Sequence, residues 1–121
     1  MEEVLVCKSD ELSNGSTRII YHGPHELAVI RYNNKFYAYS NICPHQGGPA
    51  CEGILVPKVI DALDVEGQFV GQRYDENDMH IVCPWHGYEF HLENGEHVGI
   101  KKFKLKKYNI LERGGSIYVL I

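Results

Sequence analysis

Two short segments of this chain each carry one cysteine and one histidine beside a proline. The first reads Cys43-Pro44-His45 and the second reads Cys83-Pro84-Trp85-His86. Thiolate sulfur and imidazole nitrogen both ligate metals, and two of each can hold either a [2Fe–2S] cluster or a zinc ion. The candidate metal- and cofactor-binding residues are therefore Cys43, His45, Cys83 and His86.

The spacing of the ligands distinguishes these two metal centres. Zinc sites usually group like ligands, as in a Cys-x2-Cys pair followed by a histidine pair. Here each segment mixes one thiol with one imidazole. This favours a [2Fe–2S] cluster in which one iron keeps two cysteines and the other takes two histidines. A zinc-stabilised interaction module without a redox role is the alternative.

The residues that follow each ligand pair carry a resemblance to a known family. The first segment continues into Gln46-Gly47-Gly48-Pro49 and the second into Gly87-Tyr88-Glu89-Phe90. Over residues 43–49 and 83–90 the chain resembles the Rieske family of [2Fe–2S] proteins. The resemblance implies that each loop gives its cysteine to the first iron and its histidine to the second, in one cluster per chain.

The same resemblance implies a one-electron carrier that has no catalytic residues. Small soluble Rieske ferredoxins take electrons from a flavin-dependent NAD(P)H reductase and pass them to a terminal oxygenase, often one that hydroxylates aromatic rings. The first alternative is the small subunit of an assimilatory nitrite reductase, which shares the fold. A Rieske protein that serves another oxygenase or a redox sensor is a further alternative.

Length and composition agree with a carrier of this kind. The 121 residues predict a single domain, 1–121, with room for a core but not for a second catalytic module. The start Met1-Glu2-Glu3 has no basic and no apolar region of the kind found in signal sequences, so we expect none, and no apolar run approaches the roughly 20 residues that span a bilayer. We expect a cytoplasmic protein with no membrane contact, in which Cys7 and Cys51 are buried thiols and not a disulfide.

The chain reads as all-β, with short runs of β-branched and aromatic residues separated by turn signals. Asn33-Asn34 and Gly114-Gly115 predict tight hairpin turns because Asn and Gly tolerate positive φ. The resemblance implies a Rieske-type antiparallel β sandwich or barrel with a small inserted cluster-binding subdomain. The predicted strands cover residues 4–8, 17–21, 27–32, 35–40, 79–82, 88–92, 106–111 and 116–120.

Residues 55–78 depart from the compact members of the family. Between His45 and Cys83 lie 37 residues, more than twice the usual number, and 55–78 has a net charge of −4. We expect this probable acidic insertion to form a solvated loop or a pair of short strands. The alternative is an acidic docking surface, because complementary charge speeds encounters between redox partners.

Lysines gather in segment 101–107, which is positively charged, in contrast to the acidic segment 55–78. They alternate there with Phe103 and Leu105. A period of two predicts the solvent face of a half-buried strand. The chain is acidic overall, so the lysines do not indicate nucleic-acid binding. Five histidines lie outside the two loops, and we assign them no function: His22, His25, His80, His91 and His97.

Overall fold

The computed structural model describes residues 2–44, 47–53, 55–84, 87–100 and 102–121. The secondary structure of this part of the chain is β apart from one short 3₁₀ turn, η1 (Ser9–Glu11). The strands are β1 (Glu3–Lys8), β2 (Thr17–His22), β3 (His25–Tyr32), β4 (Lys35–Ser40), β5 (Leu55–Leu63), β6 (Phe69–Val82), β7 (Glu89–His91), β8 (Lys107–Arg113) and β9 (Ser116–Leu120).

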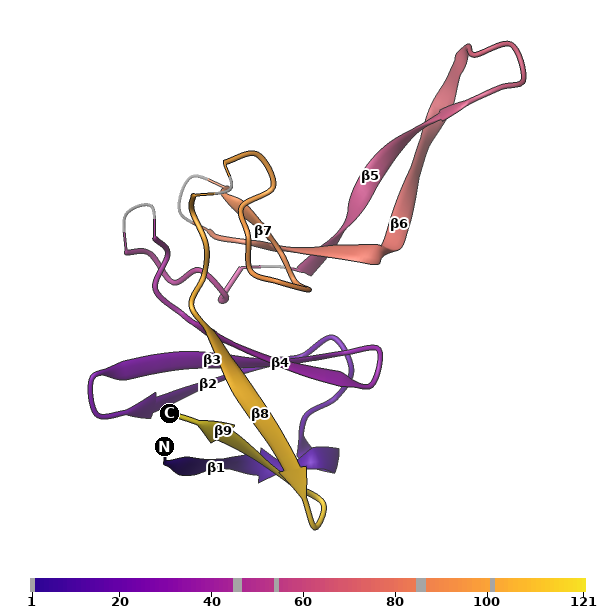
Figure 1. Ribbon diagram of the computed structural model, residues 1–121. Helices are drawn as coiled ribbons and strands as arrows, with labels where there is room; N and C mark the ends of the chain where they lie inside the picture. Colours follow the sequence, from indigo (N-terminus) through magenta and orange to yellow (C-terminus); the bar gives the residue numbers. More distant parts are fainter. Residues whose placement is uncertain (1, 45–46, 54, 85–86, 101) are drawn as a thin grey trace.

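The strands form two antiparallel sheets. A six-stranded sheet has the order β1-β9-β8-β4-β3-β2, and a three-stranded sheet has the order β5-β6-β7. Figure 1 shows the smaller sheet above the larger one, with the chain crossing to it after β4 and returning before β8. The all-β prediction, with a small subdomain inserted into a larger antiparallel structure, is therefore confirmed.

Strands β3 and β4 separate two hydrophobic cores. Successive side chains of a strand point to opposite faces, and in β3 both faces are buried. Leu27 and Val29 belong to the core under β1, β8 and β9, whereas Ala28 and Ile30 belong to the core shared with the smaller sheet. The second core also contains the predicted ligand thiols, so it connects the larger sheet to the metal loops.

Tyr39 in β4 fastens the two sheets together with a polar contact. Its side chain is fully buried, and its hydroxyl donates a hydrogen bond to the carbonyl oxygen of Leu92, just after β7. Burial raises the pKa of Tyr39 above its ordinary value, so the phenol stays protonated and can donate.

The two predicted hairpin turns are confirmed. Asn33 and Asn34 have φ values of 53° and 62° between β3 and β4, and Gly114 and Gly115 have 60° and 77° between β8 and β9. Two consecutive left-handed residues match the right-handed twist of the adjoining strands.

The acidic segment forms a pair of strands, which is one of the two forms expected for it, but the strands are longer than predicted. β5 and β6 pair from Leu55↔Ile81 out to Leu63↔Phe69. In Figure 1 this hairpin extends away from the rest of the molecule. The outer half of the hairpin is stabilised by backbone pairing and not by burial. Strands of this kind have no alternation of apolar and polar residues, so the sequence pattern does not predict them. Its role as a docking surface stays a prediction.

The lysine segment confirms the alternation but not the strand. Phe103 is half-buried and Leu105 is buried, whereas Lys102, Lys104 and Lys106 are exposed. Most of residues 102–106 is irregular, however, and β8 begins only at Lys107. A single bridge from Glu96 to Lys104 replaces the expected ladder.

The described residues include no helix long and apolar enough to cross a membrane.

Candidate metal centre

The first cysteine loop is closed by backbone hydrogen bonds. The amide of Cys43 donates to the carbonyl of Gly48 at 2.7 Å, and the amide of Gly47 donates back to the carbonyl of Cys43 at 2.8 Å. Gly47 has a φ of 76°, a left-handed conformation that side chains rarely adopt. An isolated bridge between Ile42 and Pro49 closes the base of the loop.

The second cysteine loop is closed in the same way. The amide of Cys83 donates to the carbonyl of Tyr88 at 2.8 Å, again five residues further on. Gly87 has a φ of 67° and occupies the same place after its cysteine as Gly47 does in the first loop. The two loops therefore present their cysteines from equivalent backbone positions.

Both predicted ligand thiols are buried in the same core. Cys43 is 2% exposed and Cys83 is 0% exposed. Their neighbour Cys51 is 2% exposed and is a thiol outside any disulfide, as predicted. Burial, followed by the charges of Cys83 and Cys43, raises the pKa of Cys51 to about 12. Cys51 therefore lies behind the ligand pair as a neutral packing residue.

Gly53 allows the two loops to approach each other. A Cβ atom at this position would lie 1.7 Å from the carbonyl oxygen of Val82 and 3.2 Å from Cδ of Pro84. Both of those residues adjoin Cys83. The first contact is with backbone and cannot be relieved by a rotamer change, so the absence of a side chain is required here. Sequence reasoning did not single out this glycine.

Asn41 holds the segment on either side of the first loop. Its amide nitrogen donates to the carboxylates of Glu26 and Glu52, each at 2.8 Å. Its side-chain oxygen accepts a hydrogen bond from the amide of Cys51 at 2.9 Å. The residue is fully buried, so these contacts replace water. Sequence reasoning missed Asn41, because its partners lie up to 15 residues away in the chain.

An aromatic cluster supports the second loop. The imidazole of His97 packs against the rings of Tyr88, Phe90 and Phe103. Its Nδ1 accepts hydrogen bonds from the amides of Gly99 and Ile100 at 3.0 and 2.9 Å. The histidine is thus a packing and turn residue, as expected for a histidine without a functional role.

The predicted ligands His45 and His86 lie outside the described residues, so the structure describes the sulfur half of the donor set. That half is compatible with a [2Fe–2S] cluster. Cys43 and Cys83 are buried, occupy equivalent loop positions and share one core. Two thiolates on one iron are what such a cluster requires when two histidines hold the other iron.

Comparisons with known proteins agree with this arrangement. The ferredoxin component of an alkene monooxygenase system from Xanthobacter autotrophicus is 25% identical over 119 residues, covering 98% of this chain and 81% of that protein. A solved complex of reduced oxygenase and oxidized ferredoxin in carbazole 1,9a-dioxygenase matches with a TM-score of 0.72 and 24% identity, over 97% of this chain and 91% of the matched chain.

A second solved structure is assigned as the small subunit of an NADPH nitrite reductase. It matches with a TM-score of 0.71 and 16% identity over 100% of both chains. At such identities a structural likeness shows the fold alone. The family itself is identified from the sequence, because the family model described as the Rieske [2Fe-2S] domain matches residues 2–109. This chain belongs to the Rieske [2Fe–2S] family, whose members carry one such cluster.

Proposed function

We propose that this protein is a one-electron carrier between a flavin-dependent NAD(P)H reductase and a terminal oxygenase. The oxygenase is expected to hydroxylate aromatic rings, and the exchange is expected to take place in the cytoplasm. The [2Fe–2S] cluster supplies the chemistry, because it accepts and releases one electron at a time. The protein holds the cluster, sets its surroundings and presents it to partners.

We assign the ligands as Cys43 and Cys83 on one iron and His45 and His86 on the other. The observation that carries this assignment is the equivalence of the two loops, each closed by a hydrogen bond from the cysteine amide to a carbonyl five residues on. Positions fixed by backbone contacts change little when the charge of the cluster changes. Such rigidity favours fast electron transfer.

Exposed apolar side chains lie beside the two loops. Ile42 is 49% exposed beside the first loop, and Val98 and Ile100 are each 42% exposed in the segment after β7. The amide of Val98 donates to the carbonyl of Glu89 at 3.0 Å, which ties this segment to the second loop. Exposed apolar groups near a redox centre support transient docking of a partner over the cluster.

The names of similar proteins support an oxygenase as the electron acceptor. One relative is the ferredoxin component of an alkene monooxygenase system, and one structural neighbour comes from a complex of oxygenase and ferredoxin. The nitrite reductase reading rests on a likeness of fold at 16% identity. It is kept as the second candidate. The zinc module considered from the sequence is replaced by the cluster that family membership implies.

Low-temperature EPR of anaerobically purified protein tests the ligand assignment. We expect a rhombic signal with an average g of about 1.9 after reduction by dithionite, since ligation of one iron by two histidines is what sets Rieske centres apart. His45→Cys or His86→Cys should abolish this signal or lower the reduction potential sharply, because thiolate adds negative charge. Cys7→Ser is the matched control, since Cys7 is buried in β1 away from the loops. Unchanged spectra and potentials in both histidine variants would contradict the assignment.

A reconstituted electron-transfer chain tests the partners. The protein is mixed with NADH, the flavin reductase of a Rieske oxygenase system and its terminal oxygenase, and hydroxylated product is measured. We expect product that depends on this protein and is absent with Cys43→Ser. The second candidate would be favoured instead if the protein supported nitrite reduction by a nitrite reductase large subunit and supported product formation by no oxygenase.

A further inference from the structure

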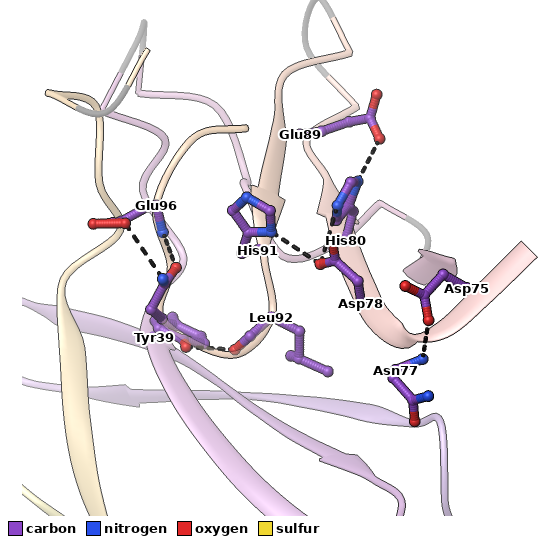
Figure 2. A network of polar contacts seen from close by, with 10 residues as sticks. Tyr39, Asp75, Asn77, Asp78, His80, Glu89, His91, Leu92 and Glu96 are labelled. Carbon is purple, nitrogen blue, oxygen red and sulfur yellow. Dashed lines mark hydrogen bonds and ion pairs between the residues drawn. The ribbon is translucent and has the colours of Figure 1, made fainter. Parts of the chain in front are cut away.

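Three ligand-type side chains meet at the base of the second loop, apart from the proposed cluster ligands. His80 in β6 is paired in register with His91 in β7, and their rings lie 5.0 Å apart in an edge-to-face arrangement. Asp78 lies two residues before His80, on the same face of β6. Figure 2 shows the Asp78 carboxylate between the two imidazoles, and one ligand atom from each residue lies within 4.8 Å of the others.

An irregularity in the β5–β6 ladder places the carboxylate. The register changes from Pro57↔Met79 to Lys58↔Asp75, so residues 76–78 of β6 have no register partner on β5. Such bulges bend a strand and redirect its side chains, and β6 bends sharply in Figure 1. Asp78 lies at the inner end of this bulge, where β6 rejoins the core.

Glu89 determines which nitrogen of His80 faces the cluster of ligands. Its carboxylate lies 3.0 Å from Nδ1 of His80. Because a carboxylate oxygen accepts hydrogen bonds, Nδ1 is the protonated nitrogen and donates a hydrogen bond to Glu89. The other nitrogen, Nε2, then keeps its lone pair. A carboxylate that orients a histidine in this way is the usual outer partner of a metal-ligating imidazole.

The Nε2 atom of His80 is the second observation that points to a ligand. It is buried, and it has no hydrogen-bond partner among the described residues. His80 itself is 7% exposed. Nε2 faces Oδ1 of Asp78 at 3.4 Å, a close approach that lacks hydrogen-bond geometry. A lone pair opposite a carboxylate is unfavourable unless a metal ion or a proton lies between them.

Two of the three distances between the ligand atoms are close to those expected around one metal ion. Oδ1 of Asp78 lies 3.0 Å from Nδ1 of His91 and 3.4 Å from Nε2 of His80. Metal–ligand bonds of about 2.0–2.1 Å in tetrahedral geometry place neighbouring donor atoms about 3.3 Å apart. Two imidazoles and one carboxylate suit zinc, iron(II), cobalt(II) or nickel(II).

We propose that Asp78, His80 and His91 together bind one divalent ion of a first-row transition metal. Glu89 is a positioning residue that holds His80 for this role. The carboxylates of Asp78 and Glu89 balance the charge of the ion. Asp78 and His91 are partly exposed, which leaves the metal an entry path and an open coordination position. The bound ion fastens β6 to β7 directly below the second cysteine loop.

Titration with Zn²⁺ tests the site on oxidised protein that retains its [2Fe–2S] cluster. We expect one Zn²⁺ bound per chain by calorimetry, with the iron content and the visible spectrum unchanged. Co²⁺ gives an independent readout, because the oxidised cluster is silent in EPR and does not overlap the high-spin Co²⁺ signal, which is compared with that of free Co²⁺. Both readouts are separate from electron-transfer activity, so they do not depend on the proposed partners.

The variants follow the proposed roles. His91→Ala should weaken Zn²⁺ binding by at least about 100-fold, and Glu89→Gln by about 10-fold, because the latter removes only an outer partner. His22→Ala is the matched control, since His22 also faces a carboxylate, Glu2 at 3.2 Å, and should bind Zn²⁺ as the wild type does. Should His91→Ala lose the iron, the isosteric Asp78→Asn provides the same test.

Two results would overturn the proposal. Failure of the wild-type protein to bind Zn²⁺ would mean that His80 carries a proton on both nitrogens and bridges the carboxylates of Asp78 and Glu89 without a metal. Equal Zn²⁺ affinity in wild type and His91→Ala would place the metal elsewhere in the protein.

Discussion

The first cysteine loop leaves β4 beside a buried amide, whereas the second leaves β6 beside a group of ionisable side chains. Asn41 holds the first loop through three hydrogen bonds. His80 and His91, joined by Asp78, lie below the second. The loops themselves share two features, a cysteine amide bonded to a carbonyl five residues on and a left-handed glycine in the same place.

The contacts that close the two loops are therefore alike, whereas the side chains that support the loops from the rest of the protein are different. Both loops have a cysteine followed four residues later by a left-handed glycine. The supports have no sequence relation to each other, and they differ chemically. We therefore expect the first loop to respond to loss of hydrogen bonds, and the second to respond to packing and to bound metal.

The contact between the loops should be the most sensitive point. In Gly53→Ala the new Cβ would lie 1.7 Å from the backbone oxygen of Val82, so the loops must separate. We expect a loss of stability of more than about 4 kcal/mol and little bound iron. Gly99→Ala is the matched control, because its Cβ would have no neighbour nearer than 3.7 Å. Iron and sulfide analysis with thermal unfolding measures both, and a fully loaded Gly53→Ala protein would contradict the predicted contact.

Packing should matter next, and specifically for the second loop. Phe90 is 0% exposed in β7, so Phe90→Ala should cost about 3–5 kcal/mol of unfolding free energy. Phe69 is 63% exposed at the outer end of the β5–β6 hairpin, and Phe69→Ala should change stability by less than about 0.5 kcal/mol. Chemical denaturation of the two variants gives the comparison. Equal losses would mean that the outer hairpin is packed in solution.

Loss of the Asn41 side chain, which supports the first loop, should have the third-largest effect on stability. Asn41→Ala removes three hydrogen bonds and leaves the amide of Cys51 without its acceptor, at a cost of about 1–3 kcal/mol. Asn109→Ala, at an exposed position of β8, is the control and should be close to neutral. Denaturant unfolding of both variants measures the cost. If they prove equally stable, Asn41 does not support the loop.

The hydrogen bond between the two sheets should have the smallest effect. Tyr39→Phe removes the bond to Leu92, and we expect a cost of about 0.5–1.5 kcal/mol near neutral pH. The pKa of Tyr39 is raised in the folded protein, so its contribution is complete below the ordinary tyrosine pKa and is lost as the pH rises above it.

Unfolding of wild type and Tyr39→Phe at pH 7 and at high pH measures this dependence. The difference between the two proteins should narrow and then reverse its sign as the pH rises, because Tyr39 ionises first in the unfolded wild type and must regain its proton when the chain folds. Tyr21→Phe, at a position that is 72% exposed, is the control. A constant difference across the pH range would contradict the role given to Tyr39.

Much of the β structure was predictable from local patterns. The strands around the Asn33-Asn34 and Gly114-Gly115 turns were expected within two residues of where they lie. They were predictable because alternation and turn residues act over a few neighbouring positions. The outer β5–β6 hairpin was not predicted as long strands, because its outer half buries little and its stability comes from pairing between residues far apart in the chain.

The sequence by itself determined the identity of the cluster: two Cys-Pro loops with mixed ligands and their flanking residues, of which His45 and His86 stay predictions. Tertiary structure decided what surrounds it. Asn41 meets Glu26 across 15 residues, Gly53 meets Val82, and His80 meets His91 only because β6 pairs with β7. Ligand type and spacing are local properties of a chain. Contacts between distant segments depend on register and burial, which exist only once the chain has folded.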